Sequence, residues 1–174
     1  SGLVSLGVKP KDNLAILSKS CPEWVIFDLG SMLAGGVTVP LHLTLSSQII
    51  AHILNHSEAK FLVVNGEDLL NKILVIQDEL KYLKKIIYIG EISDDLIELS
   101  KIKIIKWDKV MNSAVKGNLK DSHVKSADIC SIIYTSGTTG LPKGVCLTHN
   151  NFLSDIDGVL DSIPIFITDV FLSF

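Results

Sequence analysis

Short apolar runs alternate with segments of helical character along most of this chain, and this alternation constrains the fold more than any other feature. The runs are rich in Ile, Val and Leu, and we expect them to form buried strands at residues 13–17, 37–41, 61–64, 86–89, 102–106 and 129–134. Helices are expected at residues 1–6, 22–34, 48–55, 68–83, 94–99, 107–115 and 150–163. This order predicts an α/β fold with a largely parallel sheet flanked by helices.

The ends of several expected helices carry recognisable signals. Pro22 suits the first turn of a helix, Ser46 and Ser47 are candidate N-caps, and Gly7 and the pair Gly35–Gly36 are expected to end helices. Apolar residues spaced from Leu69 to Leu83 predict one continuous helix over 68–83. A last strand is expected at residues 169–174.

The expected strand at 129–134 leads into a loop, Ser136 to Gly144, that combines three glycines, three hydroxyl side chains and Lys143. Glycine lets the backbone adopt positive φ and brings amide groups close to a ligand. Consecutive amides in such a loop form a concave anion site, to which hydroxyls and an ammonium add donors. This chemistry suits a polyphosphate.

The loop does not match the two commonest nucleotide-binding patterns. The phosphate loop of the NTPases has a second glycine five residues after the first, but Pro142 stands five residues after Gly137. That pattern also has Ser or Thr after its lysine, whereas Gly144 follows Lys143. The Rossmann pattern also fails, and both folds need a helix after the loop, whereas residues 145–148 predict a strand. The loop therefore joins two strands as a hairpin over 129–149. A plain hairpin turn is the simpler alternative, but such a turn has no need for a lysine beside three hydroxyls.

Composition limits the functions open to the chain. Its 174 residues suffice for about one domain, and a net charge of −3 argues against nucleic acid as a partner. Every basic residue is lysine, so phosphate binding must use backbone amides, hydroxyls and Lys143 rather than arginine. Cys21, Cys130 and Cys146 lack disulfide or zinc spacing and are expected to be buried thiols of a cytoplasmic protein.

Three further features are better explained by a structural role than by a functional one. His52 and His56 have helical metal-binding spacing but lack the metalloprotease Glu, so structural histidines are expected. His149 is expected to position the hairpin or to cap the next helix rather than to act as a base. The apolar stretch 24–41 contains Asp28 and has Pro40 next to its end, which favours a buried helix and strand over a membrane span and leaves peripheral membrane association open.

The stretch Tyr134-Thr135-Ser136-Gly137-Thr138-Thr139-Gly140-Leu141-Pro142-Lys143-Gly144-Val145, followed by Thr148-His149, resembles the phosphate loop of the acyl-adenylate-forming superfamily. The segments 7–18, 22–24, 36–40 and 53–60 resemble the N-terminal region of bacterial long-chain fatty acid–CoA ligases. Residues 169–174 resemble the start of that family's next motif. The likeness covers nearly the whole chain and is weakest between residues 90 and 121.

The resemblance implies an ATP-dependent ligase that converts a fatty acid to acyl-AMP and then to a coenzyme A thioester. It implies ATP-phosphate binding by eight residues: Thr135, Ser136, Gly137, Thr138, Thr139, Gly140, Lys143 and Gly144. It also implies a catalytic role for Lys143, which would neutralise charge on the leaving pyrophosphate, and contact between Thr135 and Mg²⁺. ATP, fatty acid and coenzyme A are the implied partners.

The same resemblance predicts that residues 1–174 are part of the large N-terminal AMP-binding domain, cut at both ends. The family's adenine and ribose contacts, its magnesium-holding Glu and its adenylating lysine all occur later than residue 174. Two alternatives stay open: a ligase for another acid or acceptor, and a non-catalytic module that binds nucleotide or a partner. A homodimer of the full-length enzyme also stays open.

Overall fold

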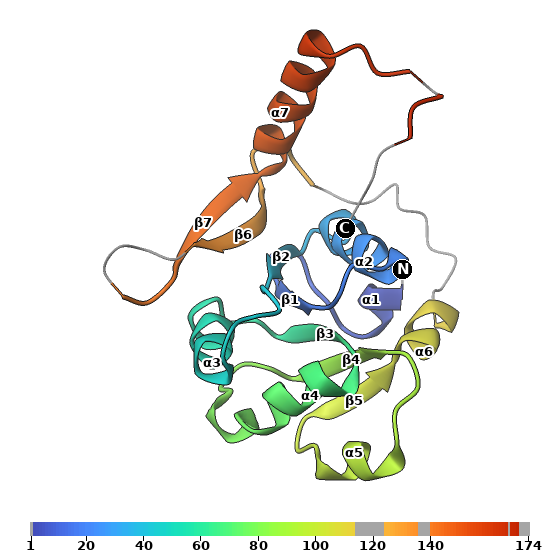
Figure 1. The fold of residues 1–174 in the computed structure, drawn as a ribbon, viewed down its shortest axis with the longest axis vertical. Coiled ribbons are helices and arrows are strands. Elements are labelled where there is room, and N and C mark those ends of the chain that lie inside the picture. The colour runs from blue at the N-terminus through green and yellow to red at the C-terminus, as the bar shows by residue number, and fades with distance from the viewer. Residues whose placement is uncertain (1, 114–123, 136–139, 167, 171–174) are drawn as a thin grey trace.

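The computed structural model of the chain describes residues 2–113, 124–135, 140–166 and 168–170. Its strands form one seven-stranded sheet in the order β5-β4-β3-β1-β2-β6-β7 (Figure 1). Every neighbouring pair is parallel except β6 and β7, which pair antiparallel. The predicted α/β fold with a largely parallel sheet is therefore confirmed. The strands are β1 (Asn13–Leu17), β2 (Val37–Pro40), β3 (Phe61–Asn65), β4 (Lys85–Ile89), β5 (Lys103–Lys106), β6 (Ile129–Thr135) and β7 (Lys143–Thr148).

The helices begin and end close to where their sequence signals place them. Pro22 is the first residue of α2, and the Ser46 hydroxyl accepts a hydrogen bond from the Ile49 amide at 3.4 Å at the start of α3. Gly7 and Gly35 follow α1 and α2 with φ values of 91° and 76°, a region that glycine enters at little cost. The helices are α1 (Gly2–Ser5), α2 (Pro22–Leu33), α3 (Ser47–His56), α4 (Glu67–Leu74), α5 (Asp94–Leu99), α6 (Trp107–Asn112) and α7 (His149–Ser162).

The prediction of one helix over 68–83 is wrong in its second half. Helix α4 ends at Leu74, and only a short 3₁₀ turn, η1 (Gln77–Glu79), follows before β4. Asn55 of α3 binds the backbone on both sides of the turn's end: its amide nitrogen donates to the Glu79 carbonyl and its oxygen accepts from the Lys81 amide, each at 2.9 Å. Ile76 and Leu83 are still buried. The apolar spacing thus predicted which residues are inside, while these tertiary hydrogen bonds replace helical ones.

Two other predictions need correction. Asp169 and Val170 lie in no strand, and the rest of the segment 169–174 falls outside the described residues. The three cysteines are free, but only Cys130 is buried; Cys21 is half-buried and Cys146 is exposed on the edge strand β7.

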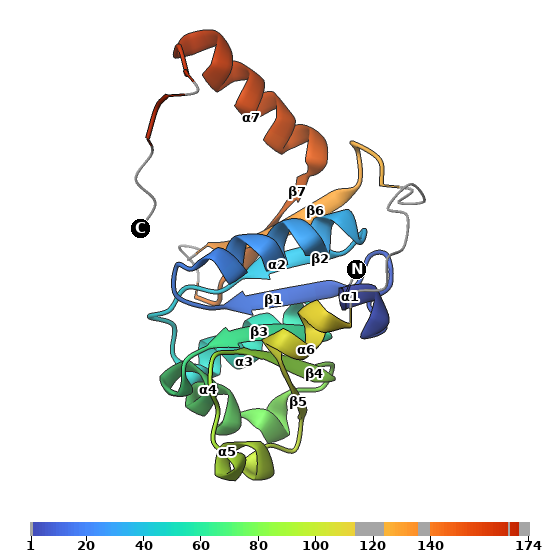
Figure 2. The same cartoon turned by 90° about the vertical axis from the view of Figure 1, so that its right-hand side faces the viewer.

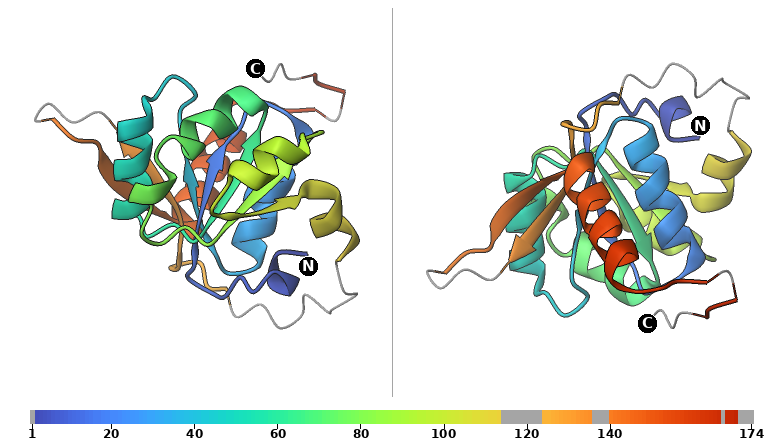
Figure 3. Two further views of the ribbon diagram at one scale, coloured as in Figure 1. Left: turned by 90° about the horizontal axis from the view of Figure 1, so that it is seen from below. Right: turned by 90° about the horizontal axis from the view of Figure 1, so that it is seen from above.

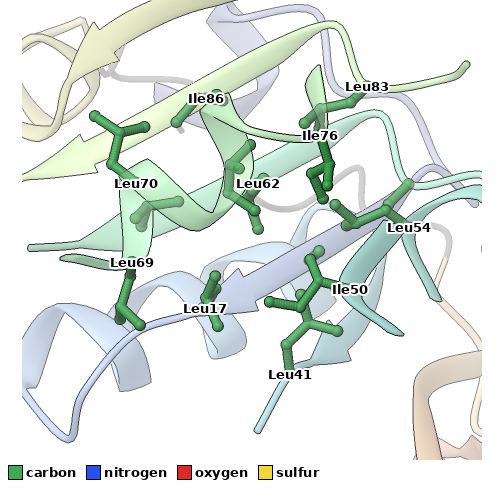
Figure 4. Packing of buried hydrophobic residues seen from close by; sticks show 14 of the residues in the cluster. Leu17, Leu41, Ile50, Leu54, Leu62, Leu69, Leu70, Ile76, Leu83 and Ile86 are labelled. Atoms are coloured by element: carbon green, nitrogen blue, oxygen red, sulfur yellow. The ribbon is translucent and has the colours of Figure 1, made fainter. Parts of the chain in front are cut away.

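The core consists of two apolar clusters, one on each face of the sheet. Successive residues of a strand point to opposite faces. Ala15 and Leu17 of β1 accordingly join a cluster with residues of α3 and α4, part of which Figure 4 shows. Leu14 and Ile16 join a second cluster with residues of α1, α2 and α6. Helices therefore cover both faces, which is why the central strands are continuous apolar runs.

The β6–β7 hairpin and α7 project from this layered body. In Figures 1 and 2 helix α7 extends away from the sheet, and both views in Figure 3 show the hairpin reaching beyond the helices. None of the residues of α7 is buried, and its Leu153, Ile156 and Leu160 are each more than half exposed. Across the described ranges, no helix combines the length and apolarity needed to cross a bilayer.

Candidate functional site

The β6–β7 hairpin brings Thr135 and Lys143 directly opposite each other at the base of its loop. They are the last paired residues before the loop, after the pair Tyr134 and Gly144. Residues opposite each other in an antiparallel pair carry their side chains on the same face of the sheet, about 5 Å apart at Cβ. Both residues are exposed. The pairing therefore places a hydroxyl and an ammonium side by side where the loop begins and ends.

The described part of the loop contains one glycine with a positive φ. Gly140 has a φ of 117°, in the region that strains other residues, and no atom of the described residues lies within 4 Å of where its Cβ would be. Glycine is thus required there by the backbone conformation and not by crowding. The remaining residues predicted for phosphate binding, Ser136, Gly137, Thr138 and Thr139, lie outside the described residues.

Gly144 is required for the opposite reason, because it is crowded. A Cβ at this position would lie 2.7 Å from Cγ2 of Ile132 and 3.2 Å from Cζ of Tyr134. Tyr134 and Ile132 both pack against the core cluster that includes α3. Since side chains alternate along a strand, Thr135 and Lys143 occupy the other face of the hairpin, away from α3. One face thus attaches the hairpin, and the other carries the polar groups.

The hairpin joins the sheet through a polar seam between β2 and β6. Thr38 pairs in parallel with Ser131. The Thr38 hydroxyl donates to the Cys130 carbonyl at 3.3 Å, and the Ser131 hydroxyl donates to the Thr38 carbonyl at 3.4 Å. All three residues are buried. Buried hydroxyls that satisfy backbone carbonyls fix the register of this short pairing.

Asp28 of α2 lies near this seam, and sequence analysis did not single it out as a site residue. Burial raises the pKa of the Asp28 carboxyl, and burial together with the Asp28 charge raises the pKa of the Cys130 thiol. Cys130 is therefore a protonated core residue and not an activated nucleophile, as its position on a buried strand predicted.

The histidines have structural partners. His52 and His56 stack with ring centroids 5.5 Å apart, and Nδ1 of His56 lies 2.7 Å from the Tyr134 hydroxyl. No group of three or more metal-ligating side chains occurs among the described residues. His149 is the first residue of α7, and the preceding Thr148 is the N-cap. The contact between His56 and Tyr134 joins residues 78 apart in sequence, so sequence spacing gave no signal of it.

A comparison with known families shows to which family the chain belongs. The sequence profile of the AMP-binding enzymes matches the chain from residue 1 to residue 174. The chain belongs to the AMP-binding enzyme family. The resemblance seen in the loop and in the segments before it is thereby confirmed, and the seven-stranded sheet is that family's N-terminal α/β architecture.

Relatives of this AMP-binding enzyme include fatty acyl-CoA synthetase B of Dictyostelium discoideum, which is 33% identical over 178 residues. That match covers 99% of this chain and 26% of the relative, so the chain spans about a quarter of the relative's length.

Among solved structures, the anthranilate CoA ligase AuaEII in complex with anthranoyl-AMP matches with a TM-score of 0.74 and 28% identity, over 91% of this chain and 29% of that one. A long-chain-fatty-acid-CoA ligase (FadD1) from Archaeoglobus fulgidus matches with a TM-score of 0.72 and 26% identity, over 93% of this chain and 30% of that one.

Proposed function

We propose that this chain is the N-terminal part of an ATP-dependent long-chain fatty acid–CoA ligase, and that its β6–β7 hairpin binds the phosphates of ATP. The observation that carries the proposal is the pairing of Thr135 with Lys143 at the base of a glycine-rich loop. That pairing occurs in a chain of the AMP-binding family whose relatives include a fatty acyl-CoA synthetase.

In the proposed reaction, a fatty acid carboxylate attacks the α-phosphate of ATP, which gives acyl-AMP and pyrophosphate. The thiol of coenzyme A then displaces AMP to form the thioester. Charge builds up on the β- and γ-phosphates as pyrophosphate leaves, and donors already aimed at those oxygens lower the barrier. Lys143 is the one charged donor proposed here, with Ser136, Thr138, Thr139 and the backbone amides of Gly137, Gly140 and Gly144 as the neutral ones.

The residues present also fit a magnesium ion bound with ATP. Thr135 offers a hard oxygen ligand on the same face as Lys143, and Mg²⁺ is held in such sites by one or two protein oxygens together with phosphate oxygens. When bound, the ion neutralises phosphate charge and orients the leaving group. We propose Thr135 as the hairpin's ligand for it.

The acid is the least constrained part of the proposal. One solved relative is an anthranilate CoA ligase and another a long-chain-fatty-acid-CoA ligase, and this chain matches both with similar TM-scores of 0.74 and 0.72. The fatty acyl-CoA synthetase of Dictyostelium favours a fatty acid. A ligase for a different acid is the second candidate.

We further propose that residues 1–174 form one part of a larger adenylation domain. The exposed apolar side chains of α7 support this, as do Val25, Leu29 and Leu33 of α2, each of which is more than half exposed. Apolar surface of this extent is normally covered by another part of a protein. The chain by itself should bind a dye such as anilinonaphthalene sulfonate strongly, whereas the full-length protein should not.

The function is tested by acid-dependent exchange of labelled pyrophosphate into ATP, with the full-length protein and a panel of acids. We expect exchange with ATP and Mg²⁺ that is greatest for long-chain fatty acids. Exchange that peaks with an aromatic acid would favour the second candidate. No exchange with any carboxylic acid would exclude adenylation and leave a binding module.

A further inference from the structure

The hairpin is attached to the rest of the fold at a second place besides the β2–β6 seam, close to its loop. The Tyr134 hydroxyl lies 2.7 Å from Nδ1 of His56, the last residue of α3. Their rings meet edge to face, with centroids 5.7 Å apart and planes at 85°. Among the side-chain hydrogen bonds of the described residues, this one alone joins α3 to the hairpin.

The helix side of this contact is held firmly. Ile53 and Leu54 of α3 are each only 1% exposed and belong to the core cluster. Asn55, next to His56, is fixed by its two hydrogen bonds to the backbone around Glu79 and Lys81. His56 therefore projects from a rigid element and can act as a fixed support.

On the hairpin, this contact lies directly beside the pair formed by Thr135 and Lys143. Tyr134 directly precedes Thr135 and pairs with Gly144, which directly follows Lys143. The Tyr134 ring covers Gly144, with Cζ 3.2 Å and Cε2 3.4 Å from the position of a Cβ there. The ring is thus held between Gly144 and His56, and a shift of Tyr134 must move Thr135 and Lys143 with it.

The protonation state suits a stable hydrogen bond. Burial raises the pKa of the Tyr134 phenol above its ordinary value, so the phenol keeps its proton at neutral pH. The phenol can then donate to Nδ1 of His56 when the imidazole carries its proton on Nε2.

We propose that His56 is a positioning residue for phosphate binding: through Tyr134 and Gly144 it fixes the base of the loop, where Thr135 and Lys143 face each other. This inference rests on the proposed function only for its effect on ATP. The mechanical part, that His56 restrains the hairpin, stands on the contacts alone. His56 touches none of the reacting groups, so its loss should weaken ATP binding more than it slows the chemical step.

The test compares four variants of the full-length protein: His56→Ala, His56→Asn, Tyr134→Phe, and His56→Ala combined with Tyr134→Phe. One hydrogen bond of this kind corresponds to about a threefold to tenfold change in an equilibrium constant. We expect His56→Ala and Tyr134→Phe each to raise the KM for ATP by about that factor, with kcat changed less than twofold. The double variant should be no worse than the poorer single variant, because both remove the same bond. His56→Asn, which keeps an acceptor near the Nδ1 position, should recover most of the loss.

Hydrogen exchange of the hairpin gives a readout that does not require activity. In His56→Ala, amides of residues 129–135 and 143–148 should exchange about threefold to tenfold faster than in the wild type. The matched control is His52→Ala, which removes an imidazole and the histidine stack from the same helix but no bond to Tyr134; it should leave hairpin exchange and the KM for ATP within twofold of wild type.

The outcomes separate the two proposals. Wild-type hairpin exchange in His56→Ala, or equal effects of His56→Ala and His52→Ala, overturns the positioning role. Additive effects of the two single variants on the KM for ATP overturn it as well. The protein could instead show no acid-dependent pyrophosphate exchange, while the hairpin amides of His56→Ala exchange hydrogen faster. That result upholds the restraint by His56 and overturns the proposed function.

Discussion

Replacing Gly144 with alanine tests the packing that holds the hairpin. The new Cβ would lie 2.7 Å from Cγ2 of Ile132, about 0.7 Å closer than the 3.4 Å at which ordinary contact begins. Cγ2 is attached directly to Cβ of a strand residue, so it cannot swing away as the end of a long side chain can. The hairpin itself must shift, and overpacking of this kind costs about 1–3 kcal/mol.

Hydrogen exchange in the full-length protein measures this cost locally. A loss of about 1–3 kcal/mol corresponds to amide exchange about five to more than a hundred times faster across residues 129–135 and 143–148. Gly158→Ala is the matched control, because no atom of the described part of the chain lies within 4 Å of a Cβ at that position in α7 and its backbone is helical. That change should stabilise α7 by about 0.5–1 kcal/mol and slow exchange there.

A second substitution identifies the clash as the cause. Ile132→Ala removes Cγ2, so combining it with Gly144→Ala should cost less than the sum of the two single changes. Strict additivity, or wild-type exchange rates in Gly144→Ala, would show that Gly144 is not crowded as the structure indicates.

Three further outcomes are expected. Burial raises the pKa of Asp28 above its ordinary value of 3.8, so the folded state binds that proton more tightly than the unfolded state. The stability that this proton contributes is complete at pH values below the ordinary pKa, and it is lost as the pH rises through the raised pKa of the folded state. Asp28→Asn should therefore raise the melting temperature at about pH 7 more than at about pH 4. Thr148 and Asn151 form a reciprocal N-cap of α7, and Thr148→Ala should cost about 0.5–2 kcal/mol, measured as faster amide exchange in the first turn of α7. Residues 1–174 alone should form no acyl hydroxamate from ATP, fatty acid and hydroxylamine, and clear turnover would show that no further residues are needed.

The sequence predicted the elements that depend on local pattern. Residues only a few positions apart determine the strands with β-branched runs, the N-cap at Ser46 and the helix ends at Gly7 and Gly35. The Thr135–Lys143 pair was not predicted, because the expected strands at 129–134 and 145–148 stop short of both residues, whereas β6 and β7 extend to them.

What the sequence could not predict depends on contacts between distant residues. Helix α4 ends at Leu74, and Asn55 of α3 binds the backbone of the turn that follows it, a contact between distant residues that periodicity alone cannot register. The role of His56 has the same origin: its spacing from His52 indicated at most a metal ligand, while its partner Tyr134 lies 78 residues away. The raised pKa of Asp28 likewise reflects burial that arises only when α2 packs on the sheet.

The most direct test of the account is the effect of Lys143→Ala on pyrophosphate exchange in the full-length protein. A charge-assisted hydrogen bond is worth about 1.5–3 kcal/mol, so exchange should slow about tenfold or more. Lys103→Ala is the matched control, since it removes an exposed lysine from β5 at the opposite edge of the sheet and should change the rate less than twofold. Unchanged exchange in Lys143→Ala, with an active wild type, would contradict the claim that this hairpin binds the phosphates of ATP.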